Sequence, residues 1–260
     1  MIKIDNLWKR FGKLQVMAGL NLEVEQGETL VILGPSGIGK SILLKHVIGL
    51  VKPDVGTVEV DGKLISELEG PELFKAIHEM GMLFQGAALF DSMNIADNIS
   101  FYLDEHGDPL TGNKLSKSEI SERVDYALDL VGLKDTRQKM PSELSGGMRK
   151  RAALARVIVY RPKVILYDEP TTGLDPITAM QINELIVKTK NELKATSIVV
   201  THDMFSALYV GDRLALIRDG KIAHSDTPDA FIKIDDPLIK FLHFSISQDP
   251  RTLKEKNQHA

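Results

Sequence analysis

Residues 34–41 read GPSGIGKS, and this stretch matches the pattern G-x-x-x-x-G-K-[ST]. The apolar run of residues 29–33 precedes it, and the helical periodicity of residues 42–48 follows it. A strand, this loop and a helix in that order form the context in which the pattern binds phosphate. Glycines allow several backbone N–H groups to point into the loop, and the N-terminus of the helix adds partial positive charge. The stretch therefore predicts a site for a nucleoside triphosphate.

Two side chains of this loop carry chemistry of their own. Lys40 supplies a positive charge for the β- and γ-phosphates, and the Ser41 hydroxyl can coordinate Mg²⁺. A guanine-reading Asn-Lys-x-Asp motif is absent, because the Asn-Lys pair at residues 113–114 continues with Leu-Ser. Adenine is favoured by this elimination, so we expect ATP and Mg²⁺. The loop residues expected to contact the nucleotide are Gly34, Pro35, Ser36, Gly37, Ile38, Gly39, Lys40, Ser41 and Ile42.

Short β-branched runs alternate with helical periodicity along the chain. This alternation predicts an α/β fold, a P-loop NTPase core with a mainly parallel sheet. The expected strands lie at residues 29–33, 57–60, 81–84, 163–167, 197–200 and 213–217. The expected helices lie at residues 40–48, 118–131, 148–159 and 179–193.

Two other features predict how the core is decorated. Asp-Gly pairs at residues 61–62 and 219–220 stand between extended segments and predict hairpin turns, hence an antiparallel β subdomain. Strand-like runs disappear after residue 85, and glycine and polar residues interrupt the sequence near residues 104–114. We expect an inserted helical subdomain at about residues 86–143 within an ATPase domain of residues 1–245, followed by a polar C-terminal tail of residues 246–260.

The composition limits the possible functions. Lys plus Arg number 32 and Asp plus Glu number 36 in 260 residues, which gives a formal net charge of −4. This balance argues against a generally basic nucleic-acid-binding protein, and we expect no nucleic-acid partner. The absence of cysteine excludes disulfides, thiolate metal sites and cysteine nucleophiles. No stretch approaches about 18 consecutive apolar residues, so we expect no membrane span.

The strand expected at residues 163–167 leads directly into two carboxylates, Asp168 and Glu169. A carboxylate at the end of a strand beside a phosphate loop suits the ligand that holds Mg²⁺ through water, which is the role we expect for Asp168. Glu169 can polarise the attacking water as a general base. Hydrolysis, as distinct from binding, is therefore predicted mainly from Glu169.

Residues 144–148 read LSGGM and open the helix expected at residues 148–159. Ser145 is a good N-cap, and Gly146 and Gly147 expose amide groups at the positive end of that helix. The turn can bind an anion but has no lysine or metal ligand of its own. These residues alone favour a simple capped helix.

The combination of GPSGIGKS, LSGGM, VILYDEP, TTGLDP and a histidine after the next strand resembles the ATP-binding-cassette (ABC) ATPases over nearly the whole chain. The resemblance implies that two subunits hold two ATP molecules between them. It also implies that Ser145, Gly146 and Gly147 contact the γ-phosphate bound by the other subunit. The chain departs from the usual pattern at Ile42, where Thr is usual, and at Met148, where Gln is commoner.

The same resemblance assigns four further positions. Phe11 matches the aromatic residue that stacks on adenine, although Trp8 could compete for that role. Gln85 matches the glutamine that contacts Mg²⁺ and water and relays to the membrane partner. Asp175 matches the aspartate at the subunit contact, and His202 matches the histidine that contacts the γ-phosphate. Without the resemblance, these four would be interpreted as a core residue, a polar strand end, a helix cap and a structural histidine.

Three segments narrow the resemblance further. LFQGAALFDSMNIADNI, MPSELSGGM and RKRAALARVI are similar to the ATPases of lipid-transport systems with mammalian-cell-entry (Mce) domains, including the Mla machinery. This implies phospholipid transport by a homodimer docked on an integral membrane permease, at the cytoplasmic face of the inner membrane and with an Mce-domain partner. Residues 86–90 would form part of the groove for a permease helix, with buried core as the alternative. An ABC importer ATPase for a polar solute such as an amino acid is the competing interpretation.

Two segments have simpler interpretations. The basic run of residues 149–151 starts a helix and is interpreted as a solvated face rather than a nucleic-acid site. An apolar stripe at helical spacing is expected to pack on the core, and a dimer-bracing role for the tail beyond it is a hypothesis. The stripe consists of Leu238, Ile239, Phe241 and Leu242.

Overall fold

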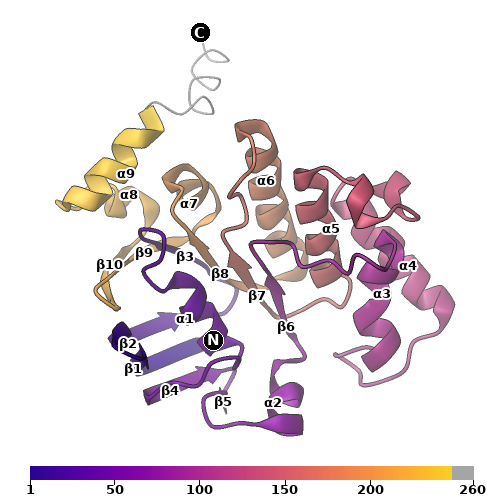
Figure 1. Ribbon diagram of the computed structural model, residues 1–260, viewed down its shortest axis with the longest axis horizontal. Coiled ribbons are helices and arrows are strands. Elements are labelled where there is room, and N and C mark those ends of the chain that lie inside the picture. The colour runs from indigo at the N-terminus through magenta and orange to yellow at the C-terminus, as the bar shows by residue number, and fades with distance from the viewer. Residues whose placement is uncertain (248–260) are drawn as a thin grey trace.

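The structure, a computed structural model, describes residues 1–247 (Figure 1). A larger sheet has the strand order β10-β9-β3-β8-β7-β6. All neighbouring strands in it are parallel except the β9–β10 pair. Its strands are β3 (Thr29–Leu33), β6 (Met80–Leu83), β7 (Val164–Asp168), β8 (Thr196–Thr201), β9 (Arg213–Arg218) and β10 (Lys221–Asp226). The mainly parallel α/β core is thus confirmed.

A smaller antiparallel sheet has the order β2-β1-β4-β5. Its strands are β1 (Ile2–Phe11), β2 (Leu14–Val24), β4 (Val55–Val60) and β5 (Lys63–Leu64). Helix α1 (Lys40–Val47) lies between the two sheets, because its Leu43 and Leu44 are buried in one cluster with side chains of both. The helix that follows the phosphate loop is therefore packed between the two sheets.

Both expected hairpin turns are present. Asp61 and Gly62 connect β4 to β5 with φ of 48° and 78°. Asp219 and Gly220 connect β9 to β10 with φ of 49° and 71°. Two successive residues with positive φ form the tight turn that matches the twist of paired strands, and Asp-Gly is among the sequences that best tolerate it.

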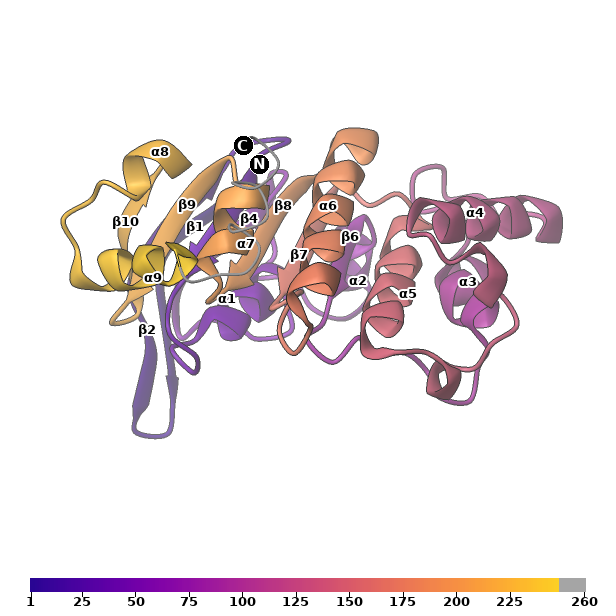
Figure 2. The same ribbon diagram turned by 90° about the horizontal axis from the view of Figure 1, so that it is seen from above.

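Helices α3, α4 and α5 gather at one end of the molecule, beside β6 and β7 (Figure 2). The bounds of the helices in this region are α2 (Gly70–Ile77), α3 (Ile95–His106), α4 (Lys117–Leu130) and α5 (Gly146–Ile158), with short 3₁₀ turns at Lys134–Thr136 and Pro141–Glu143. The chain breaks after α3 at Gly107, which has φ of 74°, so residues 104–106 are helical and not part of the expected interruption. The helical character of this region agrees with the sequence, and its limits as a subdomain stay a prediction.

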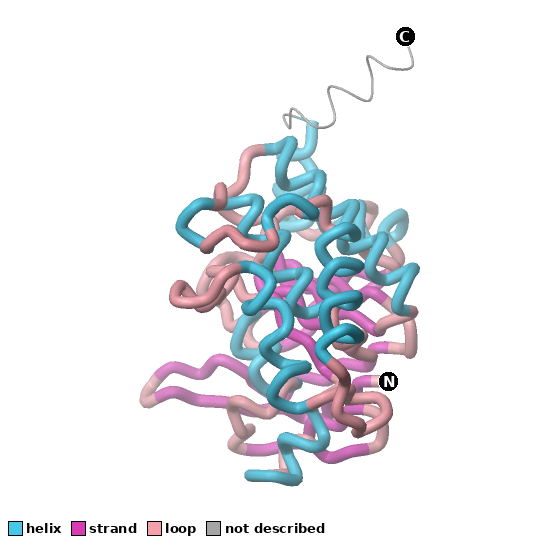
Figure 3. Tube along the Cα trace, turned by 90° about the vertical axis from the view of Figure 1, so that its right-hand side faces the viewer, coloured by secondary structure: helices cyan, strands magenta, loops and turns pink. Residues whose placement is uncertain are grey.

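Helices α6 (Pro176–Leu193) and α7 (Met204–Val210) cover one face of the larger sheet. Viewed from the end that carries α3 and α4, the helices stand in front of the strands (Figure 3). Within residues 1–247, none of the helices has both the length and the apolar character needed to cross a bilayer.

The last two helices of the described chain are the short α8 (Pro228–Phe231) and α9 (Pro237–Ser247), and the whole of the expected apolar stripe lies on α9. Ile239 is fully buried, and Leu238 and Leu242 pack partly buried against the main core. Phe241 is instead 69% exposed, so that part of the expectation is wrong. Phe241 is two positions after Ile239, about 200° around the helix, which places it on nearly the opposite side. Residues 248–260 of the expected tail lie outside the described residues.

Asp236 anchors α9 to the β9–β10 hairpin. Its buried carboxylate accepts hydrogen bonds from Arg218 and from the Nε2 atom of His224, the latter at 3.1 Å. It also accepts the backbone N–H of Leu238 at 2.8 Å. The Arg218 guanidinium lowers the pKa of Asp236 to about 2.

Asp236→Asn is expected to lower the Tm at neutral pH, because an amide cannot neutralise Arg218. The folded-state pKa lies below the ordinary value of 3.8, so the carboxylate's contribution is complete above pH 4 and is lost as the pH falls toward about 2. The Tm difference between the two proteins, followed by circular dichroism, should therefore shrink over that range. A difference that stayed constant there would contradict this assignment. Exposed Asp235→Asn is the matched control, with little effect at any pH.

Candidate functional site

The phosphate loop connects the fully buried strand β3 to α1. Gly37 and Gly39 have φ of 81° and 110°, a conformation that favours glycine. A Cβ atom on Gly39 would lie 2.5 Å from Cγ1 of Val16, so the close approach of β2 also requires glycine there. Among the described residues, none caps the first turn of α1 through its side chain, and that turn carries no acidic residue. The helix therefore presents an uncompensated positive end to the loop.

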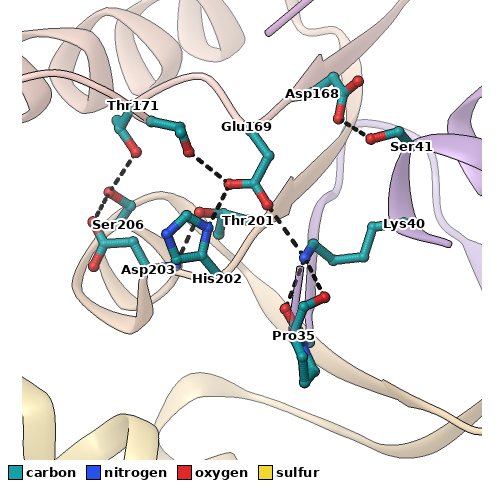
Figure 4. A network of polar contacts seen from close by, with 12 residues as sticks. Pro35, Lys40, Ser41, Asp168, Glu169, Thr171, Thr201, His202, Asp203 and Ser206 are labelled. Atoms are coloured by element: carbon teal, nitrogen blue, oxygen red, sulfur yellow. Dashed lines mark hydrogen bonds and ion pairs between the residues drawn. The ribbon is translucent and has the colours of Figure 1, made fainter. Parts of the chain in front are cut away.

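Lys40 is 5% exposed and points back into the loop (Figure 4). Its Nζ atom donates hydrogen bonds to the carbonyl oxygens of Gly34 at 2.7 Å and Pro35 at 3.0 Å. The same atom lies 3.2 Å from Oε1 of Glu169, with which it forms an ion pair. The ammonium group is thus placed at the base of the loop, between the loop carbonyls and the carboxylate.

Ser41 and Asp168 meet on one side of the site. The Ser41 hydroxyl donates to Oδ1 of Asp168 at 2.6 Å, although 127 positions separate them in sequence. Gln85, just after β6, lines the same cleft. The described residues contain no cluster of three or more His, Cys, Asp or Glu side chains suited to a metal. Hydroxyl, carboxylate and amide oxygens nevertheless fit Mg²⁺, which commonly uses one or two protein ligands together with phosphate and water oxygens.

Glu169 lies at the centre of the site. Its backbone has φ of 47°, which is unusual for a residue with a side chain, and its N–H donates to the carbonyl of Val200 at 2.9 Å. Its Oε2 atom accepts the Thr172 hydroxyl at 2.9 Å and lies 2.9 Å from Nδ1 of His202. Both oxygens of the carboxylate are therefore held, one by Lys40 and one by Thr172 and His202.

These side chains surround an open cleft of about 260 Å³. It is lined by Ser36, Gly37, Gly39, Lys40, Ser41, Ile42, Gln85, Glu169, Thr172 and His202. Three other predicted loop residues, Gly34, Pro35 and Ile38, do not line it. Gly34 and Pro35 act through their carbonyl groups, and Ile38 packs against the core cluster between the sheets.

The LSGGM turn lies outside this cleft. Ser145 caps α5 by accepting the Met148 N–H at 3.3 Å, and both Ser145 and Gly146 are exposed. Gly147 is buried against the start of α6, where an added Cβ would lie 2.3 Å from Cγ2 of Thr178.

Asp175 is an exposed residue that caps α6. Its Oδ1 atom accepts the backbone N–H groups of Ile177 and Thr178, each at 3.1 Å. The Thr178 hydroxyl and amide hold the pKa of Asp175 below its ordinary value. Like the LSGGM turn, Asp175 does not line the cleft.

A family model described as "ABC transporter" matches residues 17–172. The chain is 40% identical over 243 residues to the "Intermembrane phospholipid transport system ATP-binding protein MlaF" of Haemophilus influenzae, covering 93% of this chain and 90% of that one. The chain belongs to the family of ABC transporter ATP-binding proteins.

Other ABC proteins are similarly close. The "Methionine import ATP-binding protein MetN" of Clostridium tetani is 40% identical over 243 residues, 93% of this chain and 74% of that one. The "Probable ribonucleotide transport ATP-binding protein mkl" of Mycobacterium leprae is 39% identical over 239 residues, 92% of this chain. The chain spans 67% of the length of that relative and 65% of its Mycobacterium bovis counterpart.

The fold comparison agrees. The ATP-binding cassette MJ0796, solved as a dimer in a post-hydrolysis state with ADP and Pi, superposes with a TM-score of 0.78 and 30% identity, covering 88% of this chain and 99% of that one. The 260-residue chain, as a member of this family, is an ATPase that uses ATP with Mg²⁺.

Phe11 and Trp8 differ in how free their rings are in this ABC ATPase. Phe11 is 46% exposed at the end of β1, with the Lys9 ammonium 5.5 Å from its ring centre. The Trp8 indole N–H already donates to Oδ1 of Asn6 at 2.8 Å, and its ring packs on Gly19. Neither lines the phosphate cleft. The greater exposure favours Phe11 as the adenine-stacking residue, which stays a prediction.

Phe11→Ala is expected to raise the KM for ATP roughly five- to a hundredfold, since stacking an aromatic side chain on a base contributes about 1–3 kcal/mol. Trp8→Ala is the matched control and should change KM much less. Steady-state ATPase assays over a range of ATP concentrations provide the measurement. The reverse order of effects would assign the stacking to Trp8.

The sequence did not identify two polar contacts of Glu169. The first is the Thr172 hydroxyl. Its position three residues after Glu169, within the TTGLDP turn, is the signal in the sequence that could have indicated this contact. Lys150, 6% exposed, donates from Nζ to the backbone carbonyl of Glu169 at 3.1 Å.

The interpretation of residues 149–151 as a solvated face is wrong for Lys150, which is buried, whereas Arg149 is exposed and Arg151 is half-buried; all three side chains bind backbone carbonyls. Arg149 binds Leu144, Lys150 binds Glu169, and Arg151 binds Val131 and Gly132. Successive helical residues are about 100° apart, and the middle residue of the run, Lys150, falls on the buried side of α5.

The segment after Gln85 is only partly buried, so the alternative of buried core holds for a part of it. Ala87 is 5% exposed and belongs to the core, whereas Phe90 is 41% exposed. Ala87 and Ala88 have φ of 64° and 53°, and the Arg156 guanidinium donates to both of their carbonyls, at 3.2 and 2.6 Å. The same guanidinium lies 5.9 Å from the Phe90 ring centre. Arg156 thereby fixes an unusual backbone and holds an aromatic ring at the surface.

Proposed function

We propose that Glu169 is the general base for ATP hydrolysis and that Lys40 and His202 bind the phosphates. The observation that carries this assignment is the Glu169 carboxylate held between the Lys40 ammonium at 3.2 Å and the His202 ring at 2.9 Å, within one cleft. The backbone N–H groups of residues 36–41 complete the phosphate site. A base held by two groups that also bind the γ-phosphate is oriented toward the water that attacks it.

The residues proposed to hold Mg²⁺ are Ser41, Asp168 and Gln85. The 2.6 Å contact between Ser41 and Asp168 already brings a hydroxyl and a carboxylate oxygen together. When bound, Mg²⁺ neutralises charge on the phosphate oxygens. The protein's part is to orient these oxygens toward the phosphates.

Two copies of the chain are proposed to act together, with Ser145, Gly146, Gly147 and Asp175 serving the nucleotide held by the other copy. None of the four lines this chain's own cleft, yet Ser145 and Gly146 are exposed at a helix N-terminus. The N-terminus of a helix attracts an anion. Because this end of α5 lies outside the cleft for the chain's own nucleotide, we assign the anion to the nucleotide bound by the other copy. The dimeric state of MJ0796 supports the same arrangement.

The membrane partner is proposed to be a permease that docks over residues 86–90 and holds the chain at the cytoplasmic face of the inner membrane. Phe90 packs on Phe101, with ring centres 4.9 Å apart, and still remains partly exposed. An exposed aromatic ring on a backbone fixed by Arg156 offers a firm apolar contact for a helix. Gln85, one residue before this segment, lines the ATP cleft, so the two sites adjoin.

The cargo is proposed to be phospholipid, moved together with an Mce-domain partner. The similarity to MlaF along 90% of its length supports this, as do the segments noted above and Met148 in place of the commoner Gln. An importer for a polar solute is the second candidate, because MetN is 40% identical as well.

Purification of the tagged chain with its membrane complex, followed by mass spectrometry of proteins and lipids, tests the cargo. We expect an integral membrane permease, an Mce-domain protein and phospholipid enriched above the bulk membrane. A permease that copurifies instead with a solute-binding protein, without lipid enrichment, would establish the importer.

A further inference from the structure

Lys150 occupies an inward position on α5. The buried stripe of that helix includes Gly147, Leu154 and Val157, and Lys150 falls on it at helical spacing. Its side chain is thus largely removed from water, in a place where an uncompensated charge is costly. Burial lowers the pKa of Lys150, and the nearby Glu169 and Asp168 carboxylates act in the opposite direction.

The contact that Lys150 makes is with the backbone of the proposed base. Its Nζ donates to the Glu169 carbonyl at 3.1 Å. That carbonyl also accepts the Thr172 N–H at 3.2 Å, so the lysine is not needed merely to satisfy it. Glu169 has φ of 47°, a backbone conformation that residues other than glycine adopt only where surrounding contacts hold it. The lysine is one of these contacts.

We propose that Lys150 is a positioning residue, which fixes the main chain of Glu169 and so aims its carboxylate into the cleft. The proposal rests on the proposed role of Glu169. Lys150 lies about 1.4 turns from Ser145, the N-cap of the same helix. The helix that begins with the turn assigned to the partner's nucleotide therefore also contacts the base of this chain.

Two properties of Lys150 determine what its replacement should do. Its buried charge costs folding free energy, and its ammonium group contacts the strained backbone of Glu169. Replacing Lys150 with an apolar side chain of similar length should lower activity without lowering stability. A lysine that only stabilised the fold would behave in the opposite way.

The test compares Lys150→Met, Lys150→Arg and Arg151→Gln in the full chain with Mg-ATP. Lys150→Met should reduce kcat roughly ten- to a hundredfold, a part of the 10²–10⁴ that a positioned base contributes, with KM changed less than about threefold and Tm not lowered. Lys150→Arg keeps the charge and should recover most of kcat. Arg151→Gln removes a carbonyl contact of the same helix away from the cleft, and should lower Tm while kcat per folded molecule stays near wild type.

Three outcomes would overturn the proposal. Lys150→Met could retain kcat within twofold, it could lose Tm and activity together as a merely structural lysine would, or Lys150→Arg could be as inactive as Lys150→Met. Glu169→Gln measured alongside separates this from the role of the base. If Glu169→Gln is inactive and Lys150→Met is active, only the role of Lys150 fails; if Glu169→Gln is active, the base assignment itself fails.

Discussion

Glu169→Gln is expected to reduce ATP turnover at least about a hundredfold while leaving ATP binding nearly unchanged, since a positioned general base contributes about 10²–10⁴ in rate. The amide keeps the size of the side chain and can still bond to Thr172 and His202, which hold the carboxylate at 2.9 Å each. It cannot accept a proton from water. The altered chain should therefore accumulate with ATP bound.

Phosphate release under saturating Mg-ATP and calorimetric titration with ATP together provide the measurement. Glu184→Gln makes the same chemical change on an exposed surface of α6 and should leave both values unchanged. Normal turnover in Glu169→Gln would reject Glu169 as the base and would leave the phosphate site without its proposed chemistry.

Lys40→Met is expected to weaken ATP binding roughly a hundredfold, because a hydrogen bond to a charged group contributes about 1.5–3 kcal/mol and Lys40 serves more than one phosphate oxygen. In the structure its ammonium group has three acceptors within 3.2 Å. Loss of the ammonium also leaves the Glu169 carboxylate without its close cation, which further disfavours an incoming triphosphate.

The control for this change is Lys45→Met, on the same helix but away from the cleft. Both variants are titrated with ATP in the presence of Mg²⁺, and their Tm values are compared to show that each is folded. An affinity in Lys40→Met within a fewfold of wild type would show that the loop amides alone hold the phosphates.

The sequence predicted best where a local pattern determines the backbone. The strand at residues 29–33, the glycine loop and α1 were correct because glycine conformation and helix polarity are local properties. The two Asp-Gly hairpins were correct for the same reason. Asp168 and Glu169 could be placed at a strand end because a continuous apolar run leads directly to them.

The sequence was a poorer guide where contacts between distant segments determine which side chains are buried. The burial of Lys150 depends on which side of α5 faces β6 and α6, and the three consecutive basic residues concealed that choice. Phe241 looked like part of an apolar stripe, but only the side of α9 that faces the core is covered. Helix α3 was not separately expected, because the polar residues near its end resemble a loop until Gly107 is seen to terminate it.

The roles of Ser145 and Asp175 illustrate a different limit. Each side chain is fully explained within one chain as a helix cap. Their proposed contact with nucleotide exists only between two copies, so neither the sequence pattern nor the single chain contains the geometry. The resemblance to a family supplied that prediction.

Crosslinking tests the two-copy arrangement most directly, and the absence of native cysteine makes it clean. Chains with Glu169→Gln plus Ser36→Cys are mixed with chains that carry Glu169→Gln plus Ser145→Cys, with and without Mg-ATP, under mild oxidation. We expect a disulfide-linked pair that forms between the two kinds of chain and depends on ATP. Failure to form that pair with ATP bound, while the mixture remains folded, would contradict the proposal that the serine-glycine turn of one copy closes over the nucleotide of the other.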